Sequence, residues 1–220
     1  MESVQAGDAV MRNFLVVSAK FLSLCAFVSA ALAQEPAPDV LIRTIAEDVI
    51  ATIRQDSRLS ENPARVAALV EAKVLPHFDF AHTTRIAMGA NWRRATPEQQ
   101  ERLTLEFRAL LVRTYSGALL NFRDQSVDVK PLRAKPEDTR VTVRSEVRQP
   151  GSQPMSIDYD LEKTAEGWKV FDVKIAGASL AATYRDTFAE VVRNQGVDGL
   201  IELLSGKNRQ NGAKPAPVRT

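Results

Sequence analysis

One stretch of the sequence, Thr96 to Phe122, constrains the fold more than any other. It begins with a strong helix-start signal, because Thr96 suits the N-cap, Pro97 the first helical position and Gln99 a capping box. Apolar residues then recur at helical spacing: Leu103, Phe107, Leu110, Leu111, Tyr115, Ala118 and Phe122. A helix of roughly 26 residues would be about 39 Å long. Its broad apolar stripe predicts that other elements cover it widely.

The first 33 residues have the features of a secretory signal peptide. Arg12 and Lys20 supply positive charge, residues 21–30 form a short apolar run, and residues 31–33 (Ala-Leu-Ala) have the small-x-small pattern of a cleavage site. Met11 is a possible alternative start. The apolar run is short for a membrane span, although an uncleaved anchor is the alternative interpretation. The sequence therefore predicts export, a linker over residues 34–38, a domain over residues 39–205 and a disordered basic tail over residues 206–220.

Composition sets broad limits on the mature chain. Hydrophobic residues make up 45% and charged residues 25% of the 220 residues, as is usual for one globular domain. The net charge of +2 is too small to indicate nucleic acid as a partner. The single cysteine, Cys25, lies in the signal sequence, so the exported domain is predicted to rely on its core and not on disulfides.

Helices are predicted on both sides of a block of strands. Asp39 is a candidate N-cap for a first helix, and Asn62-Pro63 marks the start of a second. Helical spacing returns at Leu180 and again from Asp198 through Leu204.

Between these helices the apolar period changes from 3.6 to 2, which is typical of β-strands. Four strands are predicted, at residues 127–129, 141–147, 155–161 and 168–175. The alternation slips between Val170 and Phe171, which indicates either a bulge or a strand buried on both faces. The predicted fold class is therefore α+β: a four-stranded antiparallel sheet with one face covered by several helices.

No catalytic motif stands out. His77, Asp79 and His82 lie close in sequence, but their spacing does not align the histidines on one helical turn, so capping and local hydrogen bonds are favoured over a metal site. A G-x-S-x-G elbow and a phosphate-binding glycine loop are missing. Arg93 and Arg94 are candidates for binding a phosphate headgroup, because guanidinium groups match phosphate oxygens. The alternative interpretation, a solvated turn before Thr96, is favoured.

Several runs resemble the MlaC (toluene-tolerance) family of periplasmic phospholipid-binding proteins. The similar segments are Leu75–Phe80, Trp92–Gln100, Phe107–Ser116, Leu161–Val173 and Gly196–Ile201. The resemblance implies a fold that encloses an apolar cavity, no enzymatic activity, no cofactor, and a phospholipid as cargo. It also implies a monomeric periplasmic shuttle between an outer-membrane lipoprotein–porin complex and an inner-membrane ABC transporter with an MCE-domain ring. The role of such a shuttle is to maintain outer-membrane lipid asymmetry.

Under this interpretation the functional site is the wall of a cavity. The predicted lining residues are Leu103, Phe107, Leu110, Leu111, Tyr115, Ala118, Val141, Val143, Ile157, Tyr159, Tyr184 and Phe188, with Arg93 and Arg94 as headgroup candidates. Each lining residue could equally belong to an ordinary core. Two rival classes stay open: an enzyme acting on a small lipid on a cone-shaped α+β fold, and an adaptor that docks transporter partners without carrying lipid.

Overall fold

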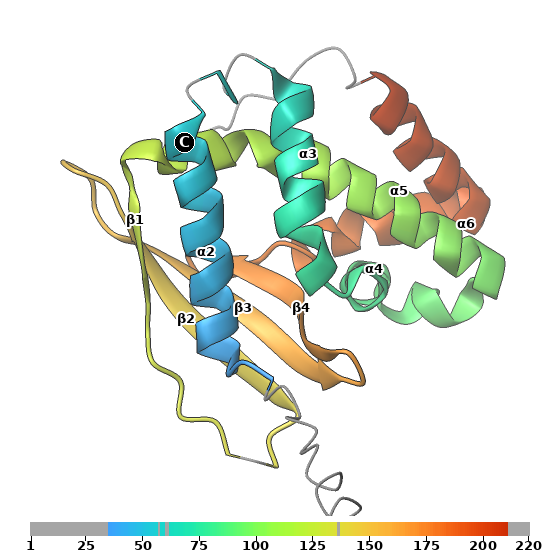
Figure 1. Ribbon diagram of the computed structural model, residues 1–220. Coiled ribbons are helices and arrows are strands. Elements are labelled where there is room, and N and C mark those ends of the chain that lie inside the picture. The colour runs from blue at the N-terminus through green and yellow to red at the C-terminus, as the bar shows by residue number, and fades with distance from the viewer. Residues whose placement is uncertain (1–34, 57, 60–61, 136, 211–220) are drawn as a thin grey trace, which may run out of the picture. The chain divides into compact units, whose positions relative to one another are not determined.

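The computed structural model describes residues 35–210 except 57, 60–61 and 136 (Figure 1). The chain divides into two units, Met1–Glu35 and Pro36–Thr220, and every helix and strand described below belongs to the second. The predicted signal peptide and residues 211–220 of the predicted tail lie outside the described residues. Within the described part of the chain, no helix has the length and apolar character needed to cross a bilayer.

Helices precede and follow the sheet, as the sequence predicts. The α-helices are α2 (Pro38–Gln55), α3 (Pro63–Lys73), α4 (Phe80–Met88), α5 (Pro97–Tyr115) and α6 (Arg185–Gln210). The 3₁₀ segments are η2 (Leu75–His77), η3 (Gly89–Arg94), η4 (Ser116–Asp124) and η5 (Ala182–Tyr184).

The helix-start signals hold in two of three cases. At α5 the Thr96 side chain accepts from the Gln99 amide while the Gln99 side chain accepts from the Thr96 amide, so the predicted capping box is confirmed. Asn62 likewise caps α3. The prediction for Asp39 was wrong: Ala37 occupies the N-cap position and α2 begins at Pro38, and the Asp39 carboxylate accepts instead from the amide of Leu132.

The long helix ends earlier than the sequence predicts. α5 stops at Tyr115, and the chain continues to Asp124 as a 3₁₀ segment of nine residues. The Ser116 hydroxyl donates to the carbonyl of Val112, and Gly117 follows directly. Because such back-bonding and a glycine both weaken an α-helix, the tighter 3₁₀ winding replaces it here.

The sheet is antiparallel and has five strands in the order β1-β2-β3-β4-β5. They are β1 (Ser126–Val129), β2 (Arg140–Arg148), β3 (Met155–Thr164), β4 (Gly167–Ile175) and β5 (Ala178–Ser179). The predicted count of four was wrong, because the two-residue β5 is too short to show an alternating pattern. The predicted bulge is confirmed, since Leu161 pairs with Val170 and Asp160 with Asp172, leaving Phe171 unpaired.

Helix α6 joins two segments that the sequence predicts as separate helices. The break between them is a kink at Gly196, where φ is 72° and ψ is −178°. The second segment runs to Gln210, so residues 206–210 of the predicted disordered tail are helical. Leu204 and Asn208 are buried in this second segment, and the Asn208 side chain donates to Glu106 of α5. These contacts explain why the helix continues past Gly206.

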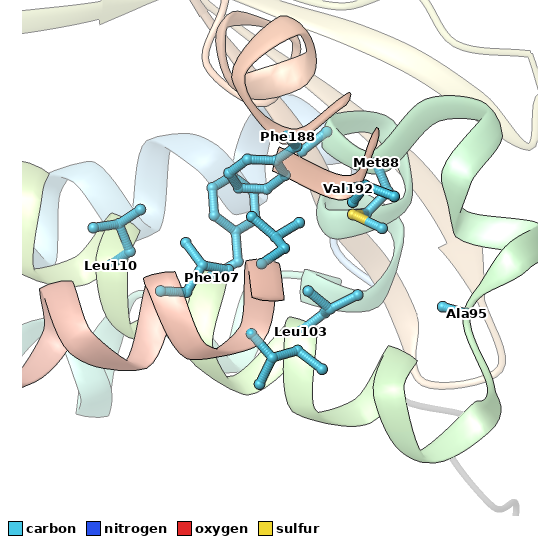
Figure 2. Close-up of a cluster of buried hydrophobic side chains, with 11 residues drawn as sticks. Met88, Ala95, Leu103, Phe107, Leu110, Phe188 and Val192 are labelled. Atoms are coloured by element: carbon cyan, nitrogen blue, oxygen red, sulfur yellow. The ribbon is translucent and has the colours of Figure 1, made fainter. Parts of the chain in front are cut away.

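The buried apolar residues form three separate clusters. The α5–α6 cluster joins these two helices to α4 and η3, and comprises Ala87, Met88, Ala95, Leu103, Phe107, Leu110, Phe188, Val192, Leu200, Ile201 and Leu204 (Figure 2). The sheet cluster comprises Ile42, Val129, Val143, Leu161 and Val170. It forms where α2 lies over the sheet (Figure 1). The α2–α3 cluster comprises Val49, Ile53, Leu59, Val66 and Leu69, with Leu119 and Leu120 of η4 packed against it.

Candidate functional site

A pocket of about 290 Å³ is bordered by residues of all three clusters or their close neighbours. Its wall is drawn from four α-helices, from the 3₁₀ segments η2 and η4, from the sheet, and from the segment that follows β5. The three clusters are each well buried, but they do not merge at this point. The pocket is therefore the place where the core of the domain is left unfilled.

Helix α2 contributes one continuous stripe to the wall. The stripe consists of Ile42, Ile45, Ala46, Val49 and Ile50. These positions follow the i, i+3, i+4, i+7, i+8 spacing that places residues on one helical face. The two ends of this stripe belong to different clusters: Ile42 is part of the sheet cluster and Val49 is part of the α2–α3 cluster. The middle of α2 therefore spans the space between these clusters.

Helix α5 divides its apolar stripe between core and pocket. Leu103, Phe107 and Leu110 are buried in the α5–α6 cluster. Leu111 and Tyr115, toward the end of the helix, line the pocket. Each residue turns the helix by roughly 100°, so neighbours such as Leu110 and Leu111 project from different sides of it.

The sheet contributes its inner face at the ends of β3 and β4. Ile157 and Tyr159 of β3 line the pocket together with Val173 and Ile175 of β4. In the register of the sheet, Tyr159 pairs with Val173 and Ile157 with Ile175, so the four side chains form two adjacent cross-strand pairs. They form the apolar part of the wall that the sheet contributes.

The polar groups on the wall are mostly engaged by the protein itself. The Thr83 hydroxyl donates to the carbonyls of Asp79 and Phe171. The buried Asp172 carboxylate accepts through Oδ1 from the amides of Val173 and Ala181. Burial raises the pKa of the Tyr159 phenol. None of the described residues that line the pocket is basic, so the pocket favours an apolar ligand over an anionic one.

Five of the predicted lining residues belong to this wall: Leu111, Tyr115, Ala118, Ile157 and Tyr159. The structure places the other seven outside this wall. Leu103, Phe107, Leu110 and Phe188 are buried in the α5–α6 cluster, and Tyr184 packs against them. Val143 is buried in the sheet cluster, with Val141 beside it. The physical reason is that α6 packs against the face of α5 that carries Leu103, Phe107 and Leu110, while α2 covers β2.

The two candidate headgroup residues lie away from the pocket. Arg93 and Arg94 are exposed at the end of η3, just before α5 begins, and Arg94 donates to the Asn91 side chain. The pocket-lining part of α5 starts at Leu111, about 21 Å along the helix axis from Pro97. The structure therefore gives Arg93 and Arg94 no place in the pocket wall.

Sequence reasoning missed the greater part of the wall. The missed residues include the α2 stripe, Val70 of α3 and the Val74 that follows it, Phe78 and Phe80, and Leu180 and Ala181. Their apolar spacing was visible, but it is the same for a residue that fills a core and for one that borders a pocket. No local signal in the sequence separates the two.

A polar cluster lies outside the pocket. The cluster consists of Asp79, His82 and Glu162. Each offers one atom that could ligate a metal ion, and these atoms all lie within 4.8 Å of one another. Asp79 caps α4 at the amide of His82, as the sequence predicts, and the His82 ring bonds to Glu162. Arg140 also donates to Glu162. Because the Arg140 guanidinium already neutralises this carboxylate, we interpret the cluster as a set of bonds that joins α4 to the sheet and not as a cation site.

Comparison with known proteins gives three concordant results. The family model described as MlaC protein matches residues 43–206. The intermembrane phospholipid transport system binding protein MlaC of Haemophilus influenzae is 23% identical over 185 residues, which cover 82% of this chain and 85% of that protein. The toluene tolerance protein ttg2D of Pseudomonas putida is 30% identical over 132 residues, which cover 58% of this chain and 61% of that protein.

A solved structure is also similar. It is the phospholipid-binding protein from Ralstonia solanacearum in complex with a phospholipid, with 44% sequence identity and a TM-score of 0.74. The match covers 80% of this chain and 99% of that chain.

Proposed function

Because this chain belongs to the MlaC family, whose model matches residues 43–206, we propose that it carries a phospholipid with the acyl chains held in the pocket between the sheet and the helices. The family binds phospholipid and is not a family of enzymes. The carrier function assigns the chain no catalytic residue and no cofactor, and it treats the phospholipid as cargo.

The observation that carries this proposal is the pocket wall. It combines apolar side chains from α2, α3, α5 and the sheet, and none of its described residues is basic. The Ralstonia solanacearum protein, 44% identical to this chain, holds a phospholipid. An apolar wall suits acyl chains, and the lack of basic residues leaves the phosphate headgroup outside the pocket.

The need for such a pocket follows from hydration. Two acyl chains of roughly 16 carbons would cost well over 20 kcal/mol to expose to water, at ~0.8 kcal/mol per methylene. A carrier must therefore surround the chains with a wall almost as dry as the bilayer. Recognition through the chains alone also tolerates different headgroups, because few protein contacts depend on them.

The remaining parts of the proposal concern place and partners. The signal-like residues 1–33 would direct the domain to the periplasm, leaving a mature chain from Gln34. There it would act as a monomer between an outer-membrane lipoprotein–porin complex and an inner-membrane MCE-domain ABC transporter, and so maintain outer-membrane lipid asymmetry. The name of the Haemophilus influenzae relative, which places it in an intermembrane phospholipid transport system, supports this arrangement.

Two measurements on the purified mature protein test the proposal. Native mass spectrometry should find one copurified phospholipid per chain, and the delipidated protein should take labelled phospholipid from vesicles. The matched control is the same protein unfolded in urea, which should extract nothing. A protein that neither copurifies with phospholipid nor extracts it would rule the carrier function out.

A further inference from the structure

The pocket ends where it meets the α5–α6 cluster. Leu111 belongs to both, since it lines the pocket and packs against that cluster. One turn earlier on the same face of α5 lies Phe107, which is fully buried. The boundary between empty pocket and filled core therefore falls between these two residues.

Three aromatic rings stand at this boundary, and we refer to Phe107, Tyr184 and Phe188 as the aromatic wall. The centroid of the Phe107 ring lies 5.0 Å from that of Tyr184 and 5.1 Å from that of Phe188, both in edge-to-face geometry. The rings of Tyr184 and Phe188 are 5.6 Å apart. Figure 2 shows Phe107 beside Phe188, with Leu103 farther along α5. Each ring thus touches the other two and closes the space between α5 and α6.

Two connections join the aromatic wall to the pocket. The phenol of Tyr184 interacts electrostatically with the phenol of Tyr115, which lines the pocket. The amide of Tyr184 also donates to the carbonyl of Ala181, another lining residue. Burial raises the pKa of the Tyr184 phenol, as expected for a hydroxyl held away from water beside the pocket.

We infer that the aromatic wall is the end stop of the pocket and sets the longest acyl chain that the protein accepts. This inference rests on the proposed function and adds to it the residues that define the class of cargo by chain length. Tyr184 is the ring to remove, because it is only partly buried and contacts both phenylalanines as well as Tyr115.

A length limit has a measurable consequence. The free energy of a methylene changes little when it moves from a bilayer into a dry pocket. Chains that fit the pocket should therefore load equally well. A methylene beyond the limit stays in water, which lowers occupancy about fourfold for each one, equivalent to ~0.8 kcal/mol. Occupancy plotted against chain length should therefore be flat and then fall steeply.

The experiment loads delipidated protein from vesicles that contain an equal mixture of phosphatidylglycerols, with two matched monounsaturated chains of about 14 to 22 carbons. Native mass spectrometry then reads the occupancy of each length. Tyr184→Ala should move the steep fall to chains longer by about two or more methylenes, because the space of one ring becomes available. Tyr184→Leu is the milder second variant and should move it less, in the same direction.

Two controls isolate the end stop. Tyr184→Phe keeps the ring and should leave the limit unchanged. Leu103→Ala shortens a side chain of the α5–α6 cluster that lies one helical turn before Phe107, on the side away from the pocket. This variant should lower stability without moving the limit. An unchanged limit in lipid-loaded Tyr184→Ala and Tyr184→Leu, or an equal shift in Leu103→Ala, would overturn the inference while leaving the carrier function standing. Failure of the wild-type protein to load any lipid would instead overturn the proposed function, and the inference with it.

Discussion

The Nδ1 atom of His82 lies 2.5 Å from Oε1 of Glu162, and this contact joins helix α4 to strand β3 across 80 residues of sequence. The His82 ring also stacks on Phe171 of β4, with 4.2 Å between the ring centroids. Helix α4 supplies Phe80 and Thr83 to the pocket wall. The polar pair outside the pocket thus fixes one of the helices that shape it.

This pair gives folding stability a predictable dependence on pH. Burial raises the pKa of Glu162, but the hydrogen bonds and charges of His82 and Arg140 together lower it by more, so the net pKa lies below its usual value. A carboxyl of this kind stabilises the fold above its unfolded pKa, about 4.3. That contribution is lost as pH falls through the folded pKa.

Glu162→Gln should therefore lower the free energy of unfolding by about 1–3 kcal/mol near neutral pH. The difference from wild type should shrink as the pH falls from about 5 toward 2.5, because the wild-type carboxyl then becomes protonated. Urea unfolding followed by circular dichroism at each pH measures it. Glu190→Gln, at an exposed position on α6, is the control and should have little effect at any pH. A deficit in Glu162→Gln that stays constant with pH would contradict this account.

A bulky substitution at the pocket should separate lipid loading from folding. Ala118 lines the pocket from η4, so Ala118→Trp should fill part of it and reduce phospholipid occupancy at least about tenfold, while the melting temperature changes little. Val143→Trp makes the same kind of change in the fully buried sheet cluster and should destabilise the protein by about 1–3 kcal/mol through overpacking. Native mass spectrometry and thermal melts distinguish the two. Normal loading by Ala118→Trp would show that Ala118 does not face the cargo.

Two adjacent leucines should differ in their contribution to stability. Leu110 is buried against α6, so Leu110→Ala should lower the free energy of unfolding by about 2–5 kcal/mol. Leu111 already borders empty space and has fewer packing partners on that side, so Leu111→Ala should cost the lipid-free protein only about 1–2 kcal/mol. Urea titration of both delipidated variants measures the difference. Equal losses would indicate that the pocket closes around Leu111 in solution.

The kink in α6 should depend on glycine at Gly196 but not at Gly206. Gly196 has φ 72° and ψ −178°, a conformation open almost exclusively to glycine, so Gly196→Ala should destabilise by about 1–3 kcal/mol. Gly206 lies in the second helical segment, and a Cβ there would meet nothing within 4 Å. Gly206→Ala should therefore be neutral or stabilise by up to about 1 kcal/mol. Thermal melts of the two variants should move in opposite directions, and a loss in both would argue against the kink as the cause.

The sequence by itself determined the features that depend on neighbours along the chain. The capping box at Thr96, the cap at Asn62 and the bulge at Phe171 all follow from local patterns, and the structure contains each of them. Where a local signal was weak, the prediction was wrong: Asp39 does not cap α2, and the two-residue strand β5 leaves no alternation to read.

Only the tertiary structure decided which part of the long apolar stripe that begins after Thr96 borders the pocket. Leu110 and Leu111 are the same residue type at consecutive positions, yet one is buried against α6 and the other lines the pocket. The difference arises because the two side chains project from α5 about 100° apart, so that one meets the α5–α6 cluster and the other meets the space that the three separately packed clusters leave open. Hydrophobicity sets which side chains leave water, but the arrangement of distant elements sets whether another side chain meets them.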